Sequence, residues 1–127
     1  MMIKGLEHTG IMVSSMEKSL DFYCGILGLE LIDRYEHPIV GVDLAFLGKD
    51  GKVLVELIAG YPVEVHTEGK VHHLAFTVDG ISEKLEQLKS HGVTLKDEQP
   101  IELPTGYYFF FYGPDGEYLE FFEQKKK

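Results

Sequence analysis

The feature that most constrains this chain is an internal repeat. The segment His8-Thr-Gly-Ile-Met-Val13 returns 65 residues later as His73-Leu-Ala-Phe-Thr-Val78. Each copy has the pattern of a β-strand, and a short polar break follows before apolar residues recur about one helical turn apart. A unit of secondary structure that is used twice predicts a fold made of two similar halves.

The two copies continue in the same way. A helix is predicted to begin near residue 16 and again near residue 81, with polar residues between the apolar positions. Strands are predicted directly after these helices, at residues 29–32 and 93–96. The residues expected to cap and end the helices are Ser15 and Gly28 in the first copy and Ser82 and Gly92 in the second.

A β-hairpin closes each copy. An Asp-Gly pair lies between two apolar runs at Asp50-Gly51 and again at Asp115-Gly116. Such a pair is a strong hairpin signal, because glycine accepts the positive φ that the turn requires. Aligning the two turns pairs Phe46 with Phe111. The strands that follow are predicted over residues 53–58 and 117–122.

Glutamates also recur in these final strands. Glu56 and Glu120 are 64 residues apart, one fewer than the histidines, and a single deletion inside the repeat explains the difference. The predicted fold is α+β, with two βαβββ modules at about residues 3–59 and 70–124 of a single domain, 1–127. The joint between them, residues 60–69, contains Gly, Pro and mixed polar residues, as expected of a surface linker.

Charge and composition limit the partners and the compartment. The chain has 12 Lys plus Arg against 21 Asp plus Glu, a net charge of -9, so its surface should repel nucleic acid. It has neither a signal-peptide pattern at its start nor an apolar run of membrane-spanning length. We therefore expect a cytoplasmic protein with no membrane association. The single cysteine, Cys24, cannot form an internal disulfide and is expected to be a packed thiol.

Strand alternation places four polar residues on comparable faces. His8 and His73 should project away from the apolar side that meets the helices, and Glu56 and Glu120 lie in the middle of apolar strands. An ionised carboxylate in such a place is costly unless a cation meets it. Taken singly, each residue is more often an ordinary solvated or hydrogen-bonded group. Recurring in register, the four predict one metal site, and their N and O donors suit Ni, Co, Zn, Mn or Fe better than Ca.

Six motifs covering nearly the whole chain resemble the vicinal oxygen chelate superfamily, which includes glyoxalases, bleomycin-resistance proteins and dioxygenases. They are His8-x-Gly-Ile-x-Val, Ser19-Leu-Asp-Phe-Tyr23, Leu27-Gly-Leu-Glu-Leu31, Val55-Glu-Leu57, His73-Leu-Ala-Phe-Thr-Val78 and Pro114-Asp-Gly-x-x-Leu-Glu120. Membership implies paired βαβββ modules that form a cup-shaped mixed β-sheet around a metal ion. The order His, Glu, His, Glu is similar to that of glyoxalase I, the lactoylglutathione lyase. Short chains of this kind resemble the glyoxalases that prefer Ni or Co, with Zn also possible.

The resemblance also implies a reaction. A glyoxalase I-like lyase isomerises the hemithioacetal of a 2-oxoaldehyde and a thiol to a thioester. It implies Glu120 as the base that moves the proton, and Glu56 as a ligand and possible second base. The cosubstrate would be glutathione or another thiol, but basic residues that bind glutathione are not evident, because Arg34 is the sole arginine. Members of the superfamily commonly pair, so a homodimer acting on a small molecule is expected.

Other functions of the superfamily stay open. Methylmalonyl-CoA epimerases resemble the chain through the pair His72-His73 but typically have Gln where Glu56 stands, and extradiol dioxygenases use a His, His, Glu triad. A binding protein of the bleomycin-resistance type would use the fold without a metal. Whether the site forms within one chain or across two also stays open.

The remaining polar and aromatic residues are assigned structural roles. His72 is predicted to point away from His73. The aromatic run 107–112 should supply core on one face and a substrate wall on the other, and residues 104–106 could form a mobile flap. Surface or solvated positions are expected for His37, His66, His91, Asp97, Glu98 and Glu102.

Overall fold

The computed structural model describes residues 1–2, 4–38, 41–60, 69 and 71–126. Its contacts divide the chain into two compact units, Met1–Val65 and His66–Lys127, and each is described by itself. The predicted linker, residues 60–69, lies outside the described residues except for Gly60 and Gly69, and so does His66. Residues 3 and 70, where the predicted modules begin, also lie outside them.

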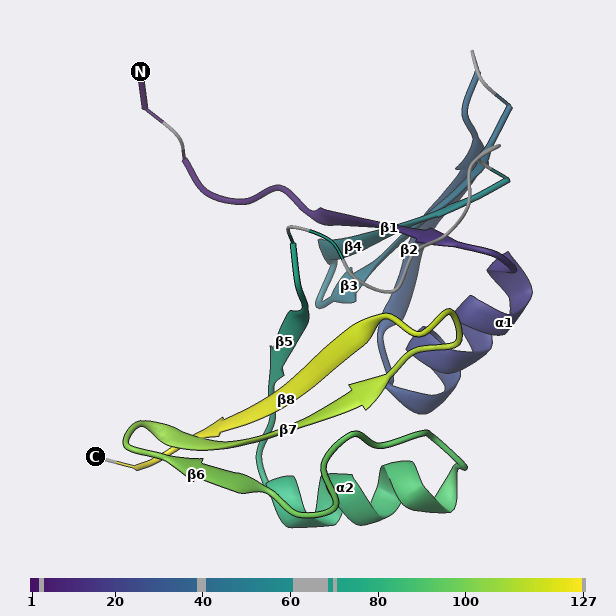
Figure 1. Ribbon diagram of the computed structural model, residues 1–127. Coiled ribbons are helices and arrows are strands. Elements are labelled where there is room, and N and C mark those ends of the chain that lie inside the picture. Colours follow the sequence, from purple (N-terminus) through teal and green to yellow (C-terminus); the bar gives the residue numbers. More distant parts are fainter. Residues whose placement is uncertain (3, 39–40, 61–68, 70, 127) are drawn as a thin grey trace. The chain divides into compact units, whose positions relative to one another are not determined.

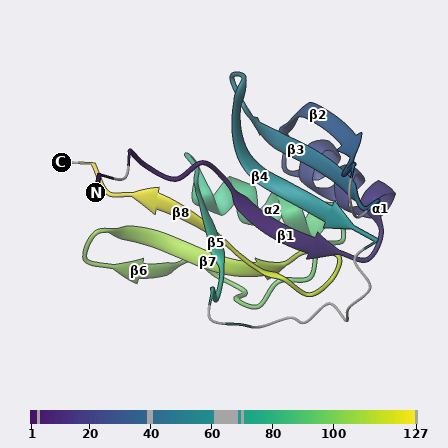
Figure 2. The ribbon, with the colours of Figure 1, turned by 90° about the horizontal axis from the view of Figure 1, so that it is seen from above.

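The first unit has the order β-α-β-β-β. Its strands form one sheet in the order β1-β4-β3-β2, with β1 parallel to β4 and the other neighbours antiparallel (Figure 2). Its elements are β1 (Thr9–Val13), α1 (Met16–Leu20), the π-helix η1 (Asp21–Ile26), β2 (Glu30–Glu36), β3 (Asp43–Lys49) and β4 (Lys52–Ala59).

The second unit repeats this order and connectivity. Its sheet runs β5-β8-β7-β6, again with only the first pair parallel, and α2 lies along the sheet (Figure 1). The prediction of an α+β fold with two βαβββ modules is confirmed. The elements are β5 (Leu74–Thr77), α2 (Ile81–Ser90), β6 (Ile101–Leu103), β7 (Gly106–Tyr112) and β8 (Tyr118–Gln124).

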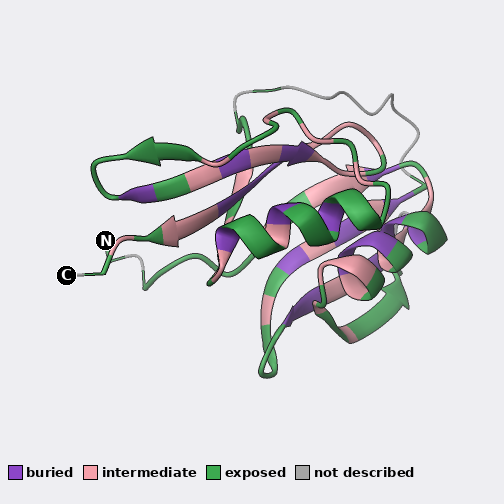
Figure 3. Cartoon of the chain, turned by 90° about the horizontal axis from the view of Figure 1, so that it is seen from below, coloured by how far each residue is buried: buried purple, intermediate pink, exposed green. Residues whose placement is uncertain are grey.

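Alternation along the strands gives each sheet a buried face and a more open face. In β4, Val55 and Leu57 are buried, whereas Glu56 between them is only partly buried. In the second unit, Phe109 and Phe111 of β7 are fully buried. Helix α2 contacts β7 and β8 and alternates between buried and exposed positions (Figure 3). The helices therefore cover the apolar face of each sheet. The opposite face, which carries Glu56 in the first unit and Glu120 in the second and is called here the glutamate face, is not covered by the helix of its own unit.

The one-residue difference between the two copies lies in the first helix. In the first unit, residues 16–28 run from the start of the helix to the glycine that ends it. The equivalent segment of the second unit, residues 81–92, is one residue shorter. The first helix changes from α to π geometry at Asp21, and the amide of Leu27 donates to the carbonyl of Phe22, five residues back, at 2.9 Å. A single inserted residue is what a π-turn accommodates. Gly28 and Gly92 both have positive φ, as predicted for helix ends.

The two helices begin differently. The hydroxyl of Ser15 accepts a hydrogen bond from the amide of Lys18, so the predicted cap is confirmed. The prediction for Ser82 is wrong, since it lies inside α2 and the cap position is Gly80, whose left-handed backbone (φ 66°) suits glycine. The carboxylate of Glu123, from β8, accepts hydrogen bonds from the amides of Gly80 and Ile81 instead. Glu123, which is distant in sequence, thus caps the N-terminus of α2, a role usually performed by the residue just before the helix.

The strand predicted over residues 93–96 is wrong. Only an isolated bridge between Leu95 and Phe111 remains. The amides of Lys96 and Asp97 both donate to the carbonyl of Phe110, and the Asp97 carboxylate accepts from the Phe110 amide. Because the Asp97 side chain occupies that donor, the backbone ladder cannot continue. Asp97 is therefore not simply a solvated charge.

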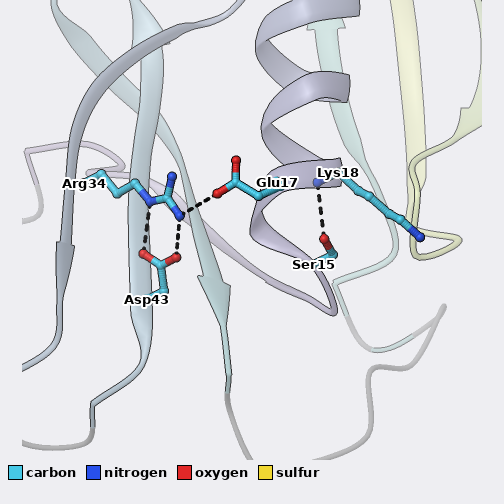
Figure 4. A network of polar contacts seen from close by, with 5 residues as sticks. All are labelled: Ser15, Glu17, Lys18, Arg34 and Asp43. Atoms are coloured by element: carbon cyan, nitrogen blue, oxygen red, sulfur yellow. Dashed lines mark hydrogen bonds and ion pairs between the residues drawn. The ribbon is translucent and has the colours of Figure 1, made fainter.

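An arginine connects the helix of the first unit to its sheet. The guanidinium of Arg34, on β2, binds Asp43 on β3 at 2.8 Å and Glu17 on α1 at 3.0 Å (Figure 4). These hydrogen bonds raise the pKa of Arg34 further above its already high value. The only arginine is thus occupied by carboxylates of its own unit. Among the described residues, no helix is long and apolar enough to span a membrane.

Candidate metal centre

The first unit brings together the two ligands predicted from its sequence. His8 immediately precedes β1, and Glu56 lies in the middle of β4, the strand parallel to β1. The Nε2 atom of His8 is 3.3 Å from Oε1 of Glu56. The side chains are 31% and 17% exposed respectively, so the carboxylate is the more buried group of the pair and the imidazole the more accessible one.

The second unit contains an equivalent pair. His73 immediately precedes β5, Glu120 lies in β8, and Nε2 of His73 is 3.1 Å from Oε1 of Glu120. The exposures are again unequal, 36% for His73 and 12% for Glu120. Burial raises the pKa of Glu120, and the nearby His73 offsets part of this rise. A partly buried carboxylate beside an imidazole is chemically suited to hold a cation or to accept a proton.

A phenylalanine lies beside each His–Glu pair, and the repeat alignment identified only the first of them. Phe46 lies opposite Glu56 and Phe110 lies opposite Glu120. Their rings meet His8 and His73 edge-on, with centroids 6.1 Å and 5.0 Å apart.

The alignment of Phe46 with Phe111 is therefore wrong by one position. The two strands keep the glutamate spacing, and a β-bulge after Leu47 shifts the turn of the first hairpin. Phe111 is fully buried on the opposite face, as Leu47 is in the first unit.

Glycine and alanine leave room beside the two carboxylates. Gly10 pairs with Glu56, and Ala75 pairs with Glu120. A Cβ atom built at Gly10 would lie 3.5 Å from Oε1 of Glu56 and 3.4 Å from Cδ1 of Ile58. These are ordinary van der Waals distances, so a methyl-sized side chain would fit beside the carboxylate.

The donor chemistry of the two pairs fits a divalent metal. Each pair offers one imidazole nitrogen and one carboxylate oxygen, 3.3 Å apart in the first unit and 3.1 Å apart in the second, and both carboxylates are mostly shielded from solvent. Among the described residues, no group of three or more His, Cys, Asp or Glu side chains is placed to hold a metal. Each unit by itself therefore supplies two donors. An imidazole nitrogen and a carboxylate oxygen are donors that suit borderline ions such as Ni, Co or Zn.

The prediction that His72 points away from His73 is wrong. The Nδ1 atoms of the two rings are 2.9 Å apart, which is a hydrogen-bond distance. The ring of His72 also packs against Tyr118, with centroids 4.9 Å apart. Both histidines precede β5, so the alternation rule, which holds only within a strand, does not apply to them.

The prediction that one face of the run 107–112 is core is confirmed, since Phe109 and Phe111 are fully buried. The other face, which carries Glu120, is aromatic as well. Tyr108 and Tyr118 both contact the ring of Phe110, and Tyr112 contacts Tyr118. The ammonium of Lys96 lies over the Phe110 ring, 5.4 Å from its centroid. Glu102, predicted to be solvated, pairs with Lys125 at the other end of the sheet.

Known proteins are similar to this chain in sequence and in fold. Residues 5–121 match the family model of the Glyoxalase/Bleomycin resistance protein/Dioxygenase superfamily. The chain is 44% identical over 126 residues to a Bacillus subtilis (strain 168) protein named "Uncharacterized protein YwbC", covering 97% of this chain and all of that one. It is 33% identical over 125 residues to a lactoylglutathione lyase of Neisseria meningitidis serogroup A, covering 94% and 91% of the two chains. The structure of a trypanothione-dependent glyoxalase I of Leishmania major superimposes with a TM-score of 0.79 at 26% identity, covering 95% and 87%.

Proposed function

The chain belongs to the Glyoxalase/Bleomycin resistance protein/Dioxygenase superfamily, and from this premise we propose that it is a metal-dependent lyase of the glyoxalase I type. Its substrate would be the hemithioacetal of a 2-oxoaldehyde and a thiol, and its product a thioester. The observation that carries the proposal is the pair of matching His–Glu contacts, His8–Glu56 and His73–Glu120. The lactoylglutathione lyases among the relatives support it.

We infer that both pairs bind the same divalent ion. A carboxylate and an imidazole at 3.1–3.3 Å can exchange their mutual contact for two bonds to a metal. Two such pairs supply four ligands, and the remaining positions of the ion stay open for solvent or substrate. Ni or Co is favoured and Zn is possible. When bound, the ion would act as a Lewis acid, stabilising negative charge that develops on the substrate oxygens.

The proton transfer is assigned to Glu120. The reaction removes a proton from the carbon that carries the hydroxyl and sulfur, and returns a proton to the neighbouring carbon, so no oxidant or reductant is consumed. Glu120 is the more buried of the two glutamates, and burial raises its pKa towards the range useful for a general base. Glu56 serves as a ligand and as a possible second base. Phe110 and its aromatic neighbours would exclude water from the substrate.

The basic side chains bear on which thiol the protein would use. Glutathione carries two carboxylates, and the guanidinium of Arg34 is already bound to Glu17 and Asp43. Lys96 is a basic side chain beside the aromatic face of the second unit, with its ammonium over the ring of Phe110. A homodimer in the cytoplasm is the expected setting.

A substrate panel tests this function. Metal-free protein is loaded with Ni, Co or Zn, and the isomerisation of methylglyoxal is followed with glutathione or bacillithiol. We expect thioester formation that requires the added metal and exceeds the rate without protein. Metal-loaded protein that forms no thioester with either thiol would refute the lyase function.

A second candidate is a metal-free binding protein for a planar aromatic compound. It is favoured by the aromatic face around Phe110 and Tyr118. Such a protein would bind its ligand equally well with and without a chelator. An epimerase-like activity, suggested by the pair His72–His73, would show metal dependence but exchange a substrate C–H proton without forming a thioester.

A further inference from the structure

The histidine before β5 makes a contact that, among the described residues, the histidine before β1 does not make. Nδ1 of His73 lies 2.9 Å from Nδ1 of His72. In the first unit, the position equivalent to His72 is held by Glu7, which is exposed. Among the residues that the structure describes, nothing forms a hydrogen bond with Nδ1 of His8. The contact is therefore an addition to the repeat and not a requirement of the βαβββ fold.

Two facing Nδ1 atoms can share only one hydrogen. A neutral imidazole carries its hydrogen on one nitrogen and a lone pair on the other, so one of the two rings donates and the other accepts. If His73 donates from Nδ1, its neutral ring has the lone pair on Nε2. This is the atom that faces Glu120 and that would bind the metal ion. A hydrogen bond at the far nitrogen of a metal-binding imidazole fixes its tautomer and orientation and increases its basicity.

We propose that His72 is the positioning residue of His73: its Nδ1 accepts a hydrogen bond from Nδ1–H of His73 and directs the unprotonated Nε2 of His73 to the metal. This inference rests on the proposed function, since it assigns His73 to a metal. The ring of His72 is itself held by Tyr118 at 4.9 Å and approaches Phe110 at 6.3 Å, between centroids. The acceptor is therefore held in place before any metal binds.

Two variants separate this role from simple packing. His72→Asn keeps an acceptor close to the position of Nδ1 but loses the ring, whereas His72→Phe keeps the ring against Tyr118 but loses the acceptor. A positioning role predicts that H72N binds metal nearly as tightly as the wild type and that H72F binds about 10- to 100-fold more weakly. A packing role predicts the opposite order. Glu7→Gln, at the equivalent position of the first unit, should leave the affinity unchanged.

The affinities are measured by competition between the protein and a chelator for Zn at fixed pH. A second readout is the imidazole NMR spectrum of the Zn-loaded protein. In the wild type, the Nδ1 proton of His73 should be shifted downfield and exchange slowly with water, and in H72F this signal should be lost.

The outcomes for this inference and for the proposed function differ. A wild type that binds Zn, together with an H72F variant that binds it equally tightly, overturns the role of His72 alone. A wild type that binds no metal overturns the proposed function and the role of His72 with it. Weaker binding by H72F, near-normal binding by H72N and loss of the protected proton in H72F support the inference.

Discussion

Phe110 lies directly opposite Glu120 in the antiparallel pair β7–β8, so its ring shares a face of the sheet with the carboxylate. The next residue, Phe111, points to the other face and is fully buried. Neighbouring phenylalanines thus serve two purposes, one beside the candidate site and one in the core.

The two phenylalanines should respond differently to truncation. Phe111→Ala leaves a cavity in the core and should lower the free energy of unfolding by about 3–5 kcal/mol. Phe110→Ala removes a half-buried ring and should lower stability much less, but impair activity because it opens the site to water. Chemical denaturation and steady-state kinetics on the same samples check this. Equal losses of stability in both variants would contradict the assignment of faces.

Gly10 should tolerate a small side chain and reject a larger one. A Cβ at this position would lie 3.5 Å from Oε1 of Glu56, an ordinary contact, and Ala75 already occupies the equivalent place in the second unit. Gly10→Ala should therefore keep the metal affinity within about twofold, a difference of about 0.4 kcal/mol. Gly10→Val should weaken metal binding clearly, because its added methyl groups crowd Glu56. A metal titration distinguishes them, and indistinguishable affinities would refute the crowding argument.

Glu123 should make the stability of the second unit depend on pH. Hydrogen bonds from the amides of Ile81 and Gly80 lower the pKa of Glu123 below its ordinary value of 4.5. A lowered pKa in the folded state means that the stabilisation is present above the unfolded value and is lost as the pH falls through the folded value.

Glu123→Gln should thus lower the melting temperature at pH 7, because one of the two acceptor oxygens is replaced by an amide group. The difference from the wild type should shrink as the pH falls below 4.5. Thermal unfolding from pH 7 to pH 3 measures it. A difference that stays constant over this range would show that the carboxylate charge has no part in capping α2.

Replacing each glutamate of the candidate site by Gln should impair a different step, catalysis for one and metal binding for the other. Glu120→Gln should reduce kcat by about 10²–10⁴-fold even at saturating metal, because the base is lost. Glu56→Gln should mainly weaken metal binding, so excess metal should restore much of the activity. Metal content and kinetics measured together check this division. Equal losses that metal cannot restore would remove the distinction between ligand and base.

The repeat in the sequence was enough to predict the architecture. A strand that begins after a histidine, a helix that ends at glycine and a hairpin with an Asp-Gly turn are local signals, and each recurs near the predicted place. The faces of β4 were also predictable, because side chains in a strand alternate strictly. Glu56 therefore lies on one face of β4, and Val55 and Leu57 lie on the other.

What the sequence did not reveal depends on contacts between distant residues. The cap of α2 comes from Glu123, more than forty residues away, and no local rule points to it. The carboxylate of Asp97 interrupts the strand predicted at 93–96 through a hydrogen bond to Phe110. The position of His72 was missed because it precedes the strand, where alternation gives no direction.

The one-residue difference between the two copies, predicted as a deletion inside the repeat, could not be located from the sequence. The histidine and glutamate spacings differ by one residue, and this could have arisen at any point between them. The π-helix at Asp21–Ile26 shows where the first unit takes up the extra residue. The turns of the two hairpins look alike in sequence, and aligning them pairs Phe46 with Phe111. In the structure the residue equivalent to Phe46 is Phe110, since each lies opposite the glutamate of the neighbouring strand.

The central claim is that two imidazoles and two carboxylates, one of each from either unit, bind one metal ion. X-ray absorption spectroscopy of nickel-loaded protein tests it most directly. The account predicts one nickel per chain, bound by two imidazole nitrogens with oxygen atoms in the remaining positions, and one imidazole fewer in each of His8→Ala and His73→Ala. A nickel spectrum without imidazole, or one unchanged by both substitutions, would contradict it.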